Sequence, residues 1–350
     1  VNVPVIAGAD RLAVSLVSSG RSSSVIDLAE TAAAFSTRGP RDVTLIPLDG
    51  YDNGDPANRL DIVILGDGYT AAQQAVFEAD AQALADGLFG FAPFSTYAGY
   101  FNAVGVFSAS NESGADQPAS CPDTSIPMNG QFKDTRYDST YCYSGIARLL
   151  VATDTTAIYD DATAGYADWD EIFVIVNDPL YGGSGGAVAV VSKTSFNVEM
   201  LQHEVGHSLI RLDDEYNTAT PGYPPCSDYG RSGITTPCRP NVTDQTSRSL
   251  IKWSRWISPS TPIPTTTAQG SEVVGLWLGA HYQPDTYYRP CYNCTMKSLG
   301  QPFGPVASEQ LPMVLYGGGW EGQGSYWDEL GSGSGIDIIE PGTTTPDPLA

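Results

Sequence analysis

A five-residue stretch near the middle of the chain, HEVGH at 203–207, has a spacing that indicates an α-helix. On an α-helix, residues four apart lie on one face, so His203 and His207 can direct two imidazole nitrogens to a single point. Glu204 lies beside that point with a carboxylate that can hold a water. The chain contains only 3 His in 350 residues, and we therefore do not attribute this spacing to chance. The pattern is typical of a catalytic zinc site.

The flanking sequence predicts the helix that this geometry needs. Apolar residues recur at steps of three and four, forming a stripe that the two histidines avoid: Val198, Leu201, Val205, Leu209 and Leu212. Thr194 or Ser195 can cap the helix start. The alternative interpretation is a buried helix whose two histidines are merely hydrogen-bonded.

A catalytic zinc needs a third protein ligand, and the residues leave several candidates. These are Asp213, Asp214, Glu215, Glu272 and His281. If the helix ran straight on, Asp214 would lie roughly 10 Å along the axis from His207, beyond reach of one ion. The helix must therefore end near 210–212, and the chain must turn back. No glycine follows at this point, so the turn must be made by another residue.

Composition restricts the compartment and the partners. The net charge of −23, with 17 Lys+Arg against 40 Asp+Glu, argues against nucleic acid and anionic membranes as partners. No segment is long and apolar enough to span a bilayer, and no signal peptide is visible at Val1, which we interpret as a processed form. We expect a monomer that is secreted, extracellular or periplasmic.

Six cysteines in Pro-rich, loop-like surroundings predict disulfides. We expect nearest-neighbour pairing, because each pair then closes one local loop: Cys121–Cys142, Cys226–Cys238 and Cys291–Cys294. The alternative for Cys291 and Cys294 is half of a structural zinc site, although no second CxxC completes it.

Several strands and helices can be predicted along the chain. The expected strands cover 60–65, 101–108 and 171–177, and the expected helices cover 71–88, with Thr70 as cap and Val76, Leu84 and Leu88 as apolar positions, and 308–316. Residues 110–140 read as a long loop, and 251–257 as a short helix or strand. We divide the chain into an N-terminal extension or propeptide remnant (1–45), a catalytic domain (46–325) and a Gly/Ser/Thr/Pro-rich linker tail (326–350).

The segment before the histidine helix has two interpretations. Residues 187–191 predict a short strand, which is either an edge strand that pairs with an extended substrate or an ordinary interior strand. The preceding glycines fit G-x-S-x-G around Ser184, the nucleophile elbow of serine hydrolases. That motif requires a strand, a sharp turn and a helix, whereas the residues after Ser184 predict a strand.

Four blocks of this sequence resemble the IgA-peptidase family of secreted bacterial metallopeptidases. They are residues 58–70 (NRLDIVILGDGYT), Pro93-Phe94 with Tyr100-Phe101-Asn102, the HEVGH stretch through Asp214-Glu215-Tyr216, and Tyr288-Arg289-Pro290 with Cys294-Thr295-Met296. Together they cover about residues 45–320. The HExxH pattern alone is common to many zinc peptidases, whereas its combination with Leu-x-Asp-Glu-Tyr is far more specific.

The resemblance implies an α/β (α+β) fold of the zincin or metzincin type, with a mixed twisted sheet, an active-site helix and a Met-turn at Met296. It implies Zn²⁺ held by His203, His207 and Asp214, with Glu204 as general base, in an endopeptidase acting on protein or peptide substrates. Asp213 departs from the family pattern. It leaves the assignment of the third ligand open, because either aspartate could reach the metal.

From these residues we predict zinc-assisted hydrolysis of a peptide bond. Tyr287, Tyr288, Tyr292 and Arg289 are candidates for assisting it. Two alternatives remain: a non-catalytic, metal-stabilised secreted binding module, and a serine hydrolase using Ser184.

Overall fold

The computed structural model describes residues 11–12, 26–27, 43–220 and 222–317. The chain divides into two units, residues 1–42 and 43–350. In the first, β1 (Arg11–Leu12) and β2 (Ile26–Asp27) form an antiparallel pair. The predicted tail, 326–350, and most of the predicted N-terminal extension lie outside the described residues.

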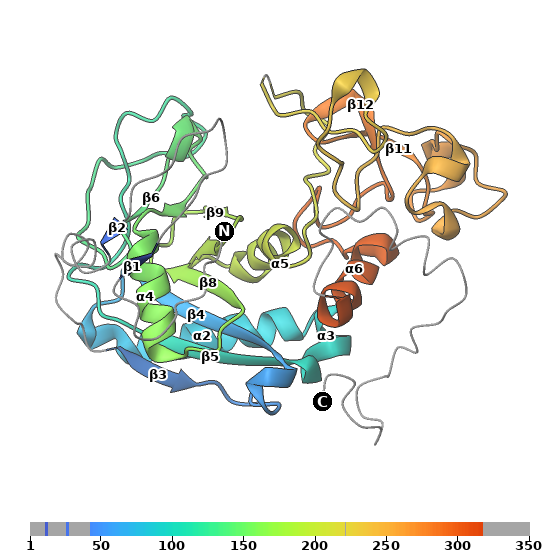
Figure 1. Ribbon diagram of the computed structural model, residues 1–350. Helices are drawn as coiled ribbons and strands as arrows, with labels where there is room; N and C mark the ends of the chain where they lie inside the picture. Colours follow the sequence, from blue (N-terminus) through green and yellow to red (C-terminus); the bar gives the residue numbers. More distant parts are fainter. Residues whose placement is uncertain (1–10, 13–25, 28–42, 221, 318–350) are drawn as a thin grey trace. The chain divides into compact units, whose positions relative to one another are not determined.

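The second unit is built on a six-stranded mixed sheet with the strand order β3-β5-β4-β8-β10-β9 (Figure 1). The strands are β3 (Thr44–Pro47), β4 (Leu60–Asp67), β5 (Phe101–Phe107), β8 (Glu171–Val176), β9 (Gly183–Ser184) and β10 (Ala189–Ser192). The four central strands are parallel, whereas β3 and β9 run antiparallel to their neighbours. The predicted strands at 60–65, 101–108 and 171–177 are confirmed as β4, β5 and β8.

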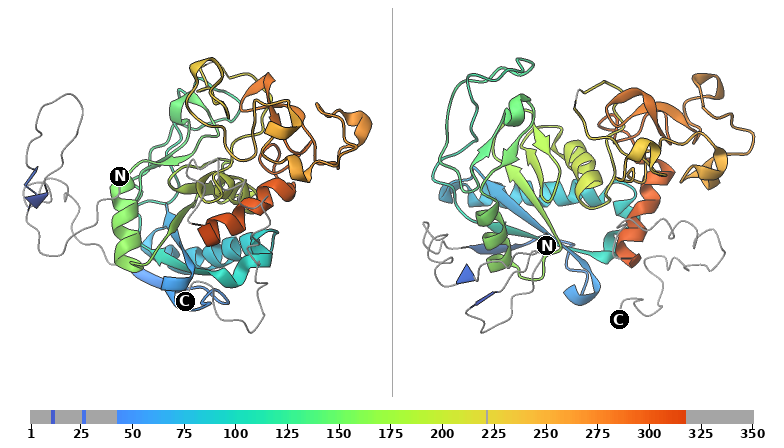
Figure 2. Two further views of the ribbon diagram at one scale, coloured as in Figure 1. Left: turned by 45° about the vertical axis from the view of Figure 1, so that its right-hand side comes forward. Right: turned by 45° about the horizontal axis from the view of Figure 1, so that its top comes forward.

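Helices cover both faces of this sheet, which explains why its central strands are almost continuously apolar. Alternate residues of β4 point to opposite faces. Ile62 and Ile64 join the core formed with α2 (Gln74–Phe89) and α5 (Asn197–Ser208). Val63 and Leu65 join a second core against α4 (Thr155–Gly165). The course of α4 beside the sheet can be followed in Figure 2.

The predicted helix at 71–88 is α2 preceded by the 3₁₀ turn η2 (Ala71–Gln73), with Thr70 as its N-cap. Leu84 and Leu88 are buried as predicted. The prediction for Val76 was wrong, because this side chain is 40% exposed. Phe77, the next residue, is fully buried in its place. Phe77 lies seven residues, about two helical turns, before Leu84 and shares its face, whereas Val76 does not.

Two other predictions concern the part of the chain after α5. Residues 251–257 form neither a full helix nor a strand. They contain one 3₁₀ turn, η7 (Ser254–Trp256), and another, η6 (Arg248–Leu250), directly precedes them. The predicted C-terminal helix is confirmed as α6 (Gly304–Gly317), which starts four residues early. Its Leu311 packs into the same core as α2 and α5.

The remaining elements are short. They are η1 (Pro56–Asn58), α3 (Phe94–Tyr97), η3 (Ala98–Tyr100), β6 (Ser139–Thr140), η4 (Tyr143–Gly145), β7 (Val151–Ala152), η5 (Arg231–Gly233), η8 (Thr267–Gln269) and the hairpin β11 (Trp277–Ala280)–β12 (Gln283–Arg289). The three predicted disulfide pairs are all present. None of the helices in the described ranges has the length and apolar character required to cross a membrane.

Candidate metal centre

Helix α5 carries the HEVGH stretch and packs it directly onto the core. Leu201 and Val205 are fully buried, as the apolar stripe predicts. Phe196 is the N-cap, and no side chain caps the helix, so the prediction of Thr194 or Ser195 was wrong. Gly206 lies over the fully buried Met296, since a Cβ at Gly206 would lie 2.4 Å from the Met296 sulfur. This contact fixes the depth of the helix above residue 296.

The chain reverses direction directly after α5, as the reach argument requires. Arg211 adopts a φ of +62°, the left-handed conformation that glycine usually supplies. The Leu212 amide then donates to the Gly206 carbonyl at 2.7 Å. This reversal returns residues 213–216 to the histidine face of the helix.

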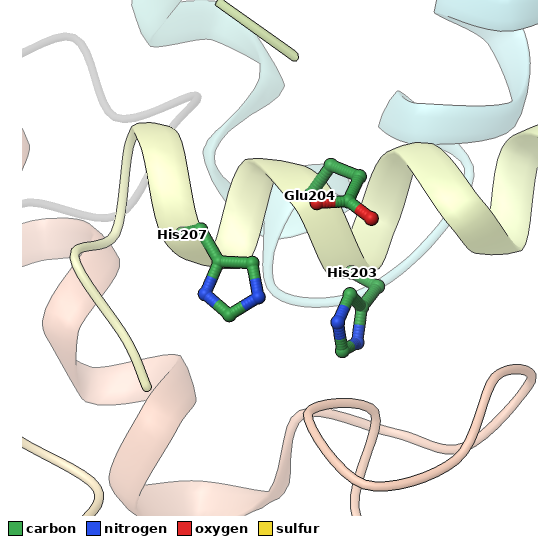
Figure 3. A group of neighbouring side chains, drawn as sticks. All are labelled: His203, Glu204 and His207. Atoms are coloured by element: carbon green, nitrogen blue, oxygen red, sulfur yellow. The ribbon is translucent and has the colours of Figure 1, made fainter. Parts of the chain in front are cut away.

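Both imidazoles project from one side of α5, as Figure 3 shows. Nδ1 of His203 lies 2.9 Å from the Thr295 carbonyl oxygen, and Nδ1 of His207 lies 3.0 Å from that of Leu212. A carbonyl oxygen can only accept, so each Nδ1 carries the proton and each neutral ring has an unprotonated Nε2. The backbone therefore sets the tautomer in which both rings can bind a metal.

Asp214 faces these two nitrogens. Its Oδ1 lies 3.2 Å from Nε2 of His203 and 3.5 Å from Nε2 of His207. This oxygen is buried and has no hydrogen-bond partner. Its other oxygen accepts a hydrogen bond from the Tyr282 hydroxyl at 2.7 Å. Three electron-pair donors thus meet without a proton between them, an arrangement that a cation or an added proton must stabilise.

The pKa values of His207 and Asp214 without a metal also indicate that a positive charge is needed between these groups. Burial lowers the pKa of His207, but the facing Asp214 carboxylate and its negative charge raise it to about 9. Burial raises the pKa of Asp214, yet the two imidazoles hold it well below its usual range. In the absence of a metal, a proton therefore occupies the space between these groups.

Glu204 completes the cluster from the same helix. One atom each of His203, Glu204 and His207 lie within 4.8 Å of one another. Burial raises the pKa of Glu204, although the two imidazoles oppose the rise. The Glu204 carboxylate makes no hydrogen bond with the part of the chain that the structure describes. Gly185 approaches closely, since a Cβ there would lie 2.6 Å from Oε2 of Glu204.

The other candidate ligands lie elsewhere. Oδ2 of Asp213 lies 2.6 Å from Nδ1 of His281. Glu215 is fully buried and accepts a hydrogen bond from Asn241. Oε2 of Glu215 lies 3.7 Å from Sγ of Cys291. Glu272 is exposed. The structure therefore brings together His203, Glu204, His207 and Asp214, and leaves the other four apart.

A cavity of about 310 Å³, the histidine pocket, contains this cluster. It is lined by Ile146, Arg148, Leu149, Gly183, Ser184, Gly185, His203, Glu204, His207, Asp214, Tyr216, Tyr223 and Tyr282. Tyr287, Tyr288, Tyr292 and Arg289, the residues that we considered for assistance, do not line it. Sequence reasoning missed Arg148 and Tyr282, because no local pattern marks residues that only the fold brings to the helix.

The edge of the sheet beside this pocket differs from the prediction. Strand β10 contains most of the predicted edge strand but lies between β8 and β9, so the edge interpretation was wrong. The edge strand is β9, within the glycine cluster that precedes β10. Its outer side already bonds to another segment: Gly183 N–H donates to the Arg148 carbonyl at 3.1 Å, and Leu150 N–H to the Gly183 carbonyl at 3.4 Å.

The serine-hydrolase alternative is not favoured. Ser184 lies within β9, and its hydroxyl donates to the Leu150 carbonyl at 2.6 Å. The chain continues into strand β10, whereas a nucleophile elbow continues into a helix. His281 uses Nδ1 for Asp213 and Nε2 for the Pro224 carbonyl, and it does not line the histidine pocket in which Ser184 lies.

Comparison with known families agrees with this site. A sequence model of the family described as IgA Peptidase M64 matches residues 48–271, which is more than half of the chain and includes α5 and Asp214. The chain belongs to the IgA Peptidase M64 family. Membership implies a metallopeptidase, whose substrates are proteins or peptides. A search among curated proteins found no match.

Proposed function

We propose that this protein is a secreted, zinc-dependent endopeptidase with a metzincin-like catalytic domain over residues 46–325. His203, His207 and Asp214 hold the metal, and Glu204 is the general base. The observation that carries the proposal is the buried Oδ1 of Asp214, which faces two unprotonated Nε2 atoms and has no hydrogen-bond partner.

The donor set fits zinc in chemistry and in spacing. Two imidazole nitrogens and one carboxylate oxygen are a usual set for a catalytic zinc, with a fourth position left for water. Zinc bonds of about 2.0–2.1 Å at a tetrahedral centre place neighbouring ligand atoms about 3.3 Å apart. The separations of 3.2 and 3.5 Å from Asp214 to the two nitrogens match this value. The buried Met296 below Gly206 supports assignment of a Met-turn.

When bound, zinc supplies a Lewis acid that makes water more acidic and stabilises negative charge developing on a carbonyl oxygen. Glu204 accepts the proton of the attacking water and passes it to the leaving amine. Burial raises the pKa of this carboxyl group, which brings its proton affinity closer to what both transfers need. Tyr282 orients Asp214 by donating to the carboxylate oxygen that faces away from the imidazoles.

The disulfides support secretion, because such bonds persist in oxidising compartments. The second candidate function is a metal-stabilised binding module without activity. The free carboxylate of Glu204 at the centre argues against it, since a structural metal site has no need of a base.

The proposal is tested by digesting casein with the wild-type protein, with and without a chelator, and with Glu204→Gln. We expect Glu204→Gln to retain metal and lose about 10²- to 10⁴-fold in turnover. Glu199→Gln, a change of the same kind in the first turn of α5, is the matched control and should remain active. Full activity in Glu204→Gln, or activity that a chelator does not reduce, would contradict the proposal, and a metal-loaded protein that never cleaves would favour the binding module.

A further inference from the structure

Three arginines differ from the others in the described region. Between residues 43 and 317, most arginine side chains form a hydrogen bond or an ion pair: Arg59, Arg136, Arg231, Arg248, Arg255 and Arg289. Arg148, Arg211 and Arg239 are exposed and form neither with any described residue. In a chain with 40 Asp+Glu, exposed arginines that form no ion pair in this region leave their charge available to a ligand.

All three line the cleft around His207. Arg148 lines the histidine pocket. Arg211 and Arg239 line a second cavity of about 470 Å³, the adjoining pocket. The two pockets share Gly185, His207 and Tyr223. Because the two pockets adjoin at His207, a peptide that occupies both would lie beside Arg148 in one pocket and beside Arg211 and Arg239 in the other.

The backbone holds Arg148 firmly at this place. Its carbonyl accepts from Gly183 of β9, and its neighbours 149 and 150 continue along the same edge. An extended substrate cannot pair with β9 at Gly183 unless it displaces this segment. The substrate would therefore be recognised less by main-chain pairing than by the side chains that line the histidine pocket. Arg148 is the arginine among them.

Arg211 occupies a backbone position that favours glycine. Its φ of +62° is a conformation in which a side chain is strained. Strain of this kind points towards use of the side chain. Three acids line the two pockets. Asp213 pairs with His281, Asp214 faces His203 and His207, and Glu204 is the proposed general base.

We propose that the cleft selects peptides with acidic side chains on both sides of the bond that is cleaved. Arg148 binds the acidic side chain on one side, and Arg211 with Arg239 binds that on the other. This inference rests on the proposed function and names its substrate class. The three arginines can act on a bound peptide despite the net charge of −23, because salt at about 0.15 M screens charges more distant than about 8 Å.

The test uses peptides with one cleavable bond, each with Glu, Gln or Lys at single positions on either side, at about 0.15 M salt. We expect wild-type kcat/KM to be about five- to tenfold higher for Glu than for Gln. The difference should appear in KM, because a contact remote from the reacting atoms acts equally on the ground state and the transition state. Arg148→Gln should abolish the preference on one side only, and Arg239→Gln should reduce it on the other, where Arg211 remains.

Arg231→Gln is the matched control, because this arginine is also exposed but lines neither pocket. Arg148→Lys should retain part of the preference, since it keeps the charge. Equal use of Glu and Gln peptides by the wild type overturns the proposal. The proposal is also overturned if Arg148→Gln lowers kcat equally for neutral and acidic peptides. Arg148 would then act on the reacting carbonyl and not on an acidic side chain.

A binding measurement separates this inference from the peptidase proposal. The same Glu and Gln peptides are titrated calorimetrically into Glu204→Gln and into Glu204→Gln with Arg148→Gln. Tighter binding of the Glu peptide that Arg148→Gln removes supports the acidic preference even if the wild type cleaves nothing. Equal binding of the two peptides contradicts it even if the wild type is an active peptidase.

Discussion

Asp213 and Asp214 are consecutive in the chain, yet their carboxylates have different partners. Oδ1 of Asp214 lies 3.2 Å from Nε2 of His203, whereas Oδ2 of Asp213 lies 2.6 Å from Nδ1 of His281. The segment after Arg211 is not helical, so neighbouring side chains can point in different directions. One aspartate faces the proposed metal, and the other holds the loop that carries Tyr282.

This division predicts opposite effects of two similar substitutions. Asp214→Ala should weaken metal binding by at least about 100-fold, because it removes a ligand. Asp213→Ala should keep one metal per chain but lower the free energy of unfolding by about 1–3 kcal/mol, because the buried His281 loses its partner. Metal content after dialysis and urea unfolding in chelator measure the two effects. Loss of metal in Asp213→Ala and retention in Asp214→Ala would reverse the assignment.

Tyr282 predicts an effect of a residue that does not touch the metal. Its hydroxyl donates to Oδ2 of Asp214 at 2.7 Å and fixes the direction of Oδ1. Tyr282→Phe should weaken metal binding about 10- to 100-fold, measured by competition with a chromophoric chelator. The matched control is Tyr223→Phe, whose hydroxyl lies 3.4 Å from Asp213. If both variants bind metal like the wild type, Tyr282 does not orient Asp214.

Gly185 leaves the space that the Glu204 carboxylate occupies. A Cβ at residue 185 would lie 2.6 Å from Oε2, so Gly185→Ala must displace this carboxylate. We expect metal content to be unchanged and kcat to fall about 100-fold, within the range that a misplaced general base costs. Gly99→Ala is the control, since nothing lies within 4 Å of a Cβ there. Unchanged kcat in Gly185→Ala would show that the position of Glu204 tolerates displacement.

The sequence was sufficient for the helix and its two histidines, because spacing within one helix is local information. It was not sufficient for the proposed third ligand, because the turn that Arg211 makes through a positive φ decides which aspartate faces the two histidines. Arg148 and Tyr282 belong to segments that only tertiary packing brings to α5. The order of β9 and β10 was equally invisible, because hydrophobic periodicity identifies a strand and does not identify its neighbours.

Glu171 predicts a pH dependence of stability that is separate from the metal. It is 8% exposed at the start of β8, and burial raises its pKa to about 7, more than the nearby Ser208 and Arg211 lower it, while Asp170 adds to the rise. The folded protein therefore binds this proton more tightly than the unfolded chain does. The free energy of unfolding should therefore fall as the pH rises from 4.5 to 7, by on the order of 3 kcal/mol from this group.

Glu171→Gln removes this charge and should flatten that part of the profile. Urea unfolding at pH 5 and pH 8, in chelator so that metal binding does not contribute, gives the comparison between wild type and variant. The variant should be the more stable protein at pH 8 and should lose less stability than the wild type between the two values. Identical pH profiles would show that Glu171 is not buried as a charge.

The most direct test of the metal centre is anomalous X-ray scattering at the zinc edge from crystals of the zinc-loaded protein. We predict one strong peak at about 2.0–2.2 Å from Nε2 of His203, Nε2 of His207 and a carboxylate oxygen of Asp214. A peak beside Glu215 and Cys291, or no peak between the two imidazoles, would contradict the proposed centre.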